Sequence, residues 1–397
     1  MRLYGALAAA MCGALAPAQT VLFPQPSLAR IQQGLHDIYT LRFTNAEAVF
    51  QGMIKQAPDD PAGHTYLAMT YWVAELAEKQ ELSIDRFAAS DFFAETPRYT
   101  PVVDPETEQK FRQTTEQAIQ KSRSRLTKSP GDRQALFLLG VAYQNLASFE
   151  ASLKRHWWAA FRAGTKTYKY HEELLRRDPN FHDARLTIGA YRYVAASLPR
   201  SIKWFAILLG YLGSKERGKA DLALAAEKAV LTADDARVTL ALIYVRERNY
   251  PKAAEYLTQL VERYPENHLI RLDLGGMALL MRKPDHAIAI YQEALKRSPA
   301  LEKALAYTRI GVALREKDDH PNAVKWFSRA MAEPGTTQRS LTVARLELAK
   351  TLDLLGQREE AVKHYQSVAS AEDVAGSRKE AGALLQHPYR SRRNAGD

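Results

Sequence analysis

Apolar and small residues recur at helical spacing along the second half of the chain. An alanine is followed four residues later by a large apolar residue, and both positions lie on one face of a helix. The alanines, at spacings of 34, 36 and 38, are Ala253, Ala287, Ala323 and Ala361. The large residues that follow them are Leu257, Tyr291, Phe327 and Tyr365. A period of this length predicts stacked hairpins of two helices.

Small residues upstream of the alanines predict where the two helices of a pair lie closest. Gly275 and Gly311 each follow a large apolar residue half a unit before the alanine. We expect these glycines to let the facing backbone approach, and Tyr291 and Phe327 to fill the space between neighbouring pairs. Pro265 closes one unit, because proline cannot extend the second helix.

Weaker copies of the pattern precede residue 234, and no alternating apolar pattern of strand length stands out. We therefore predict an all-α chain, a right-handed superhelical solenoid of antiparallel helix pairs, with roughly seven or eight pairs. The array is expected to span residues 19–386, with its clearest repeats at 234–369. Residues 387–397 are expected to form a basic, disordered tail.

The recurring positions of residues 234–369 resemble the tetratricopeptide repeat family. Residues 181–300 also resemble the inclusion-body-clearance (Iml-type) tetratricopeptide family. That resemblance rests on a helix with Tyr191 and Tyr193, then Leu198-Pro199, an apolar run at 204–213 and an alanine-rich helix at 220–230. It implies a non-catalytic repeat protein near membranes or lipid, and it carries over no catalytic residue. The chain departs from that family at its N-terminus.

The N-terminus has the pattern of a bacterial-type export signal. Arg2 precedes an apolar stretch from Leu3 to Leu15, which is too short to anchor the chain across a bilayer. Ala16-Pro17-Ala18 predicts cleavage after Ala18 and a periplasmic or secreted mature chain. The mature chain then lacks cysteine, so no disulfide is available to it.

The charge balance narrows the classes of partner. The chain carries 55 Lys and Arg against 45 Asp and Glu, a formal net charge of +10. Export argues against nucleic acid and leaves an anionic membrane surface or a protein partner. Two segments favour the membrane: the apolar and basic residues 200–219, and the adjacent basic, aromatic stretch 154–177. Both segments are also compatible with buried or solvated helix faces.

The sequence offers no convincing catalytic, cofactor or metal site. Residues 213–220 match part of a phosphate-binding loop, but Ala220 replaces the hydroxyl that would hold magnesium. We expect Gly213 to end one helix and Ser214 to cap the next. The histidines are scattered, and His156 is notable only because Trp157 and Trp158 follow it.

We therefore predict a non-enzymatic scaffold that binds a protein or peptide partner in a concave groove lined by first helices. The alternative is a peripheral membrane- or lipid-associated module, and the sequence leaves the oligomeric state open. The proline-rich loop at 90–107 is expected to brace the groove. Arginine and tyrosine are typical interface anchors. The candidate partner-binding residues are Tyr71, Gln144, Arg192, Tyr244 and Arg271.

Overall fold

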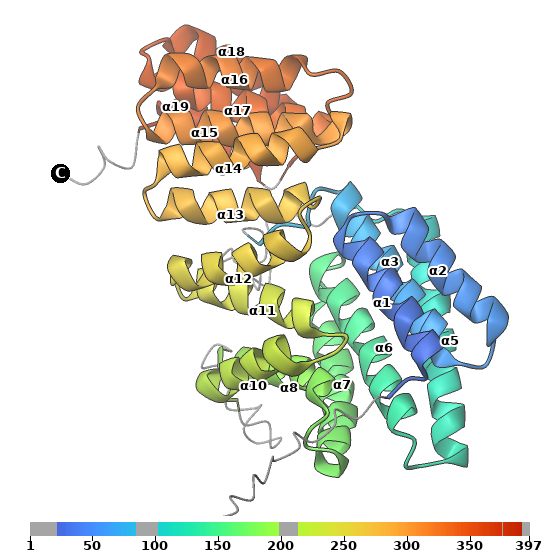
Figure 1. The fold of residues 1–397 in the computed structure, drawn as a ribbon. Helices are drawn as coiled ribbons and strands as arrows, with labels where there is room; N and C mark the ends of the chain where they lie inside the picture. The colour runs from blue at the N-terminus through green and yellow to red at the C-terminus, as the bar shows by residue number, and fades with distance from the viewer. Residues whose placement is uncertain (1–21, 85–101, 198–212, 375, 391–397) are drawn as a thin grey trace, which may run out of the picture.

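The computed structural model describes residues 22–84, 102–197, 213–374 and 376–390, and these residues form helices and no strand (Figure 1). Consecutive helices pack as antiparallel pairs, and each pair packs on the next. The predicted all-α solenoid of helix pairs is therefore confirmed. The predicted signal peptide, the apolar run up to residue 212 and tail residues 391–397 lie outside the described residues.

Eight helix pairs follow one another in the described part of the chain. The first three pair α1 (Gln25–Tyr39) with α2 (Phe43–Gln56), α3 (Pro61–Glu78) with α5 (Pro105–Lys128), and α6 (Arg133–Ser152) with α7 (Trp157–Arg177). The next two pair α8 (Arg185–Ser197) with α10 (Lys215–Lys228), after the short helix η1 (His182–Ala184), and α11 (Ala233–Arg246) with α12 (Tyr250–Arg263).

The last three pairs have the most regular sequence pattern. They are α13 (His268–Leu280) with α14 (Pro284–Arg297), α15 (Lys303–Glu316) with α16 (His320–Ala332), and α17 (Gln338–Leu354) with α18 (Arg358–Ser370). The short helix η2 (Ala300–Glu302) precedes α15, and α19 (Ser377–Gln386) packs on α18.

Local sequence explains where several helices begin. Proline stands in the first turn of α3 and of α5, where its missing N–H is not needed. The Asp104 carboxylate accepts the N–H of Thr107 at 2.8 Å and caps α5. Residues 105–107, predicted as part of a long loop, are therefore helical. Most of that loop lies outside the described residues.

Aromatic rings occupy the space over the repeat glycines. A Cβ atom added to Gly275 would lie 2.3 Å from the ring of Tyr291, and one added to Gly311 would lie 2.6 Å from Phe327. Each glycine thus makes room for a ring of its own pair, not for the facing backbone as predicted. Tyr291 also packs with Ile310 of the next pair, so the ring joins two pairs as expected.

A histidine takes the place of this ring in the α6/α7 pair. A Cβ atom on Gly140 would lie 2.1 Å from the imidazole of His171. His171 is buried, stacks on Phe137 and has Nε2 3.1 Å from the Phe137 carbonyl. Burial lowers the pKa of His171 to about 4. This histidine is therefore a neutral packing residue.

Candidate functional site

The first helices α11, α13, α15 and α17 form a surface that holds parts of the chain itself, and we call it the first-helix surface. The ring of Tyr39, at the end of α1, stacks on Tyr264 at a centroid distance of 4.7 Å. The Tyr39 hydroxyl donates to Asp235 of α11, whose carboxyl pKa burial raises to about 6. Asn267, which caps α13, donates its side-chain amide to the Tyr39 carbonyl at 2.7 Å. The first helix pair therefore docks against the middle of the array.

Residues 81–84, which follow α3, also lie against the first-helix surface, beside α13 (Figure 1). Asp273 of α13 accepts the Ser83 hydroxyl at 2.9 Å and the Ile84 backbone N–H at 3.2 Å. Arg339 of α17 pairs with Glu81 at 2.6 Å. Ile84 packs into the apolar cluster that α11, α12 and α13 share. Two first helices therefore hold residues 81–84, which end at the helical residue Ile84, through one backbone N–H and through side chains.

The start of the C-terminal tail contacts the same surface further along. Asp353 of α17 accepts the backbone N–H of Tyr389 at 2.8 Å. The Tyr389 ring centroid lies 5.4 Å from the guanidinium carbon of Arg315 and 5.8 Å from the Lys350 ammonium nitrogen. At Tyr389 a carboxylate accepts a backbone N–H and two cations lie near the side chain. At residues 81–84 a carboxylate likewise accepts a backbone N–H, and Arg339 pairs with a side chain.

An ion network lies beneath Tyr389. Glu347 of α17 is 2.6 Å from Arg315 and 2.7 Å from Lys350. Burial alone would raise the pKa of Glu347, but the two cations outweigh it and lower the pKa to about 2. Glu380 of α19 lies 2.6 Å from Lys350 and adds a second carboxylate. The network joins the last two first helices to the terminal helix.

The five predicted partner-binding residues lie on five different first helices, as the spacing predicted. They are Tyr71 on α3, Gln144 on α6, Arg192 on α8, Tyr244 on α11 and Arg271 on α13. Each contacts another part of the chain through its side chain. Their respective contacts are Glu47, Thr187, Asp221, Tyr256 and the Pro265 carbonyl.

The residues that hold the 81–84 stretch and the tail were missed by sequence analysis. They are Asp273, Arg339, Asp353, Arg315 and Lys350. The sequence feature that could have indicated them is a charged residue between apolar neighbours on a helix, such as Asp273 between Leu272 and Leu274. A buried charge needs a partner, so such a position indicates a polar contact. The sequence alone does not tell which segment supplies that contact.

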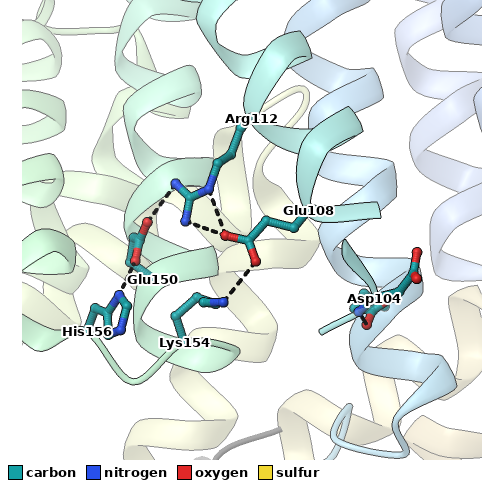
Figure 2. A network of polar contacts seen from close by, with 7 residues as sticks. Asp104, Glu108, Arg112, Glu150, Lys154 and His156 are labelled. Atoms are coloured by element: carbon teal, nitrogen blue, oxygen red, sulfur yellow. Dashed lines mark hydrogen bonds and ion pairs between the residues drawn. The ribbon is translucent and has the colours of Figure 1, made fainter. Parts of the chain in front are cut away.

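A second candidate surface lies where α6 turns into α7, and Figure 2 shows the polar network behind it. Arg112 of α5 pairs with Glu108 at 2.8 Å and with Glu150 at 2.9 Å. Lys154 pairs with Glu108 at 2.8 Å, and His156 Nδ1 lies 3.1 Å from Glu150. These contacts tie the turn at 153–156 to α5 and fix the start of α7.

The outer face of α7 is basic and aromatic, and we call it the α7 face. Trp158 is 72% exposed, and its ring lies 5.9 Å from that of Phe161. Arg162, Lys166 and Lys169 are exposed on the following turns. Residues 151–171 contain no Asp or Glu. The α7 face therefore combines an exposed tryptophan ring with positive charge.

The phosphate-loop lookalike is a helix start. Ser214 caps α10 by accepting the N–H of Arg217 at 3.2 Å, as predicted. Gly213 does not have the left-handed φ of a helix-ending glycine. A Cβ atom there would lie 2.2 Å from the backbone nitrogen of Ala196, so glycine permits a close approach to α8. Lys219 pairs with Glu247 at 2.7 Å.

Within the described residues, no group of three or more His, Cys, Asp or Glu side chains is placed to hold a metal ion. In the same part of the chain, no helix has the length and hydrophobicity needed to cross a membrane.

The geometry defines a helical-repeat solenoid, and a family model described as tetratricopeptide repeat matches residues 238–301 and 279–335. These residues carry tetratricopeptide repeats, within the range that the sequence pattern predicted. No comparison confirms the inclusion-body-clearance family. A search of curated proteins found no match.

Several solved structures resemble the chain at low identity. Yeast Tom70 is 13% identical over 92% of this chain and 82% of its own, with a TM-score of 0.41. The APC/C hetero-tetramer Cut9–Hcn1 is 14% identical over 92% of this chain and 56% of its own, at 0.47. A tetratricopeptide repeat protein from Parabacteroides merdae is 13% identical over 81% and 99%, at 0.33. These scores are too low to support any argument about function.

Proposed function

We propose that the protein is an exported, non-catalytic scaffold whose first-helix surface binds a protein or peptide partner. One observation carries the proposal: at Tyr389 this surface holds a non-helical stretch of its own chain by contacts that also recognise a peptide. Asp273 and Asp353 accept backbone N–H groups, while Arg339 and Arg315 face side chains. Backbone contacts of this kind give affinity for extended chain, and side-chain contacts give selectivity.

Site-specific photo-crosslinking in envelope extract tests the proposal. A photoreactive phenylalanine analogue replaces Tyr244 or Arg271 on first helices, or Thr258 or Gln292 on second helices as matched controls. We expect the same crosslinked partner from both first-helix positions and none from the controls. Equal crosslinking from all four positions, or none from the first helices, would contradict the proposal.

Export is proposed from the N-terminal sequence alone. The positive start, apolar stretch and Ala16-Pro17-Ala18 support cleavage after Ala18. N-terminal sequencing of the protein purified from its native host should begin at Gln19. A chain that begins at Met1 in the cytoplasm would remove this part of the proposal.

A second candidate function is peripheral contact with an anionic membrane, and the α7 face favours it. Exposed Trp158, with the partly buried Phe161 beside it, suits the interfacial region, and the neighbouring cations suit anionic lipid. Vesicles with anionic lipid should co-sediment the wild type less as salt rises, and Trp158→Ser or Arg162→Glu should reduce binding. Lys252→Glu on α12 is the control for charge alone. Equal loss in the control, or no binding by the wild type, argues against this function.

A further inference from the structure

The contact of Tyr389 with α15 and α17 has the features of a peptide site. Arg315 and Lys350 are each only 7% exposed, although both carry full positive charge. Desolvated cations need compensation, which Glu347 gives to both of them and Glu380 of α19 gives to Lys350. The ring of Tyr389 adds its negative face to that compensation.

Residues 387–390, the described part of the tail, contact this site through Tyr389. The backbone N–H of Tyr389 binds Asp353, and its ring lies over the two cations. Asp353 is also held from behind, since it accepts the Tyr365 hydroxyl at 2.9 Å and pairs with Arg358 at 3.0 Å. The receptor side is therefore formed by helices of the array, and Tyr389 of the tail contributes its backbone N–H and its ring.

The site also has an unmet donor. The Nε of Arg315 is buried and lacks a hydrogen-bond partner within the described part of the chain. A buried donor without a partner costs free energy, so residues 387–390 are an incomplete ligand for this site. A peptide that supplies an aromatic ring and a nearby oxygen acceptor would satisfy more of the site than residues 387–390 do.

We propose that Arg315, Lys350 and Asp353 form a receptor site for a short peptide with an aromatic residue beside a hydrogen-bond acceptor. In the free chain, residues 387–390 occupy this site, and a partner's peptide exchanges with them. The inference rests on the proposed scaffold function and specifies one of its sites. The crosslinking positions Tyr244 and Arg271 lie on α11 and α13, so the two proposals fail separately.

Saturation-transfer NMR on the full chain tests the exchange, because it detects weak peptide binding. The probe is an acetylated pentapeptide with the sequence of residues 386–390. We expect transfer to its tyrosine ring from the Tyr389→Ala variant, with several-fold less from the wild type. Tyr389→Phe keeps the ring and should exclude the probe as the wild type does. The same probe with alanine in place of tyrosine should give no transfer.

The location is tested by adding Lys350→Met or Arg315→Met to Tyr389→Ala. Both changes keep an unbranched side chain while removing the charge. Two variants are used so that the test still stands if one of them does not fold. Folded double variants, verified by circular dichroism, should lose transfer to the probe. Equal transfer to wild type and Tyr389→Ala, no transfer to either, or unchanged transfer to the double variants would overturn the proposal.

Discussion

A first-helix glycine contacts the second helix in four helix pairs, but what it contacts differs between two groups of them. The regular pairs are α13/α14 and α15/α16, and the irregular pairs are α6/α7 and α8/α10. In the regular pairs, a ring of the second helix lies over the first-helix glycine. In α6/α7 an imidazole replaces that ring. In α8/α10 a Cβ atom on Gly189 would lie 2.7 Å from the Gly218 carbonyl oxygen, so two backbones meet there. The small residue is common to all four pairs, but its neighbour is not.

This difference determines how each pair responds to added volume. A ring can rotate or shift when its neighbour grows, whereas a backbone held by helical hydrogen bonds yields little. A buried imidazole adds a dependence on pH that a phenyl ring lacks. The irregular pairs are therefore expected to lose more stability on substitution than the regular ones.

The largest effect is expected from Gly213→Val, next to the α8/α10 pair. The added side chain would meet the backbone of Ala195 and Ala196, which cannot move aside. We expect the free energy of unfolding to fall by about 3 kcal/mol or more. Urea denaturation measures this, with Gly164→Val as the control because a Cβ there meets nothing within 4 Å. Equal effects of the two changes would refute the close contact.

A smaller loss is expected from Gly275→Leu and Gly311→Leu in the regular pairs. Each leucine would push against the ring of Tyr291 or Phe327, and overpacking costs about 1–3 kcal/mol. Thermal melts measure the loss. Gly52→Leu on α2 is the control, since that glycine has open space beside it. Unchanged melting temperatures for both variants would contradict the observed packing.

His171→Phe should remove a pH dependence that is specific to the α6/α7 pair. The pKa of His171 falls to about 4 in the folded chain, so protonation favours the unfolded chain. Stability from this group is complete above its ordinary pKa of about 6.5 and is lost as pH falls toward 4. From pH 7.5 to pH 5, the wild type should lose about 2 kcal/mol more than His171→Phe.

The variant is compared with the wild type at each pH, because other groups titrate in the same range. Asp235, whose carboxyl pKa is raised to about 6, contributes a slope of opposite sign to both proteins and cancels in the difference. A difference that stays constant between pH 7.5 and pH 5 would show that His171 does not titrate as its burial requires.

The regular pairs were predictable from sequence because spacing alone defines them. The repeat of alanine and large apolar residue placed Ala287, Tyr291 and Gly275 on facing helices, and the structure agrees. The role of His171 was not predictable in detail, since no spacing rule tells which residue covers Gly140. The self-contacts of Asp273 and Asp353 depend on how far the superhelix turns, and a local pattern does not encode that.

The smallest effect is expected from Lys219→Ala, six residues after the sensitive glycine. Lys219 pairs with Glu247 and lies 5.8 Å from the Tyr244 ring centroid, and it is partly exposed. Such a pair contributes up to about 1 kcal/mol, so the variant should melt close to the wild type.

If residues 213–220 were a phosphate-binding loop, Lys219 would instead be essential for binding nucleotide. The lysine of such a loop contacts the phosphates, and a following hydroxyl holds magnesium, but here Ala220 stands in that place and the described residues include no strand. Calorimetry with ATP and magnesium should therefore give no heat of binding for wild type or variant. Binding that Lys219→Ala abolishes would restore the nucleotide interpretation. If Lys219→Ala lost as much stability as Gly213→Val, Lys219 would instead belong to the contact between α8 and α10. Calorimetry and thermal melting together therefore distinguish a surface ion pair from a nucleotide site and from a packing residue.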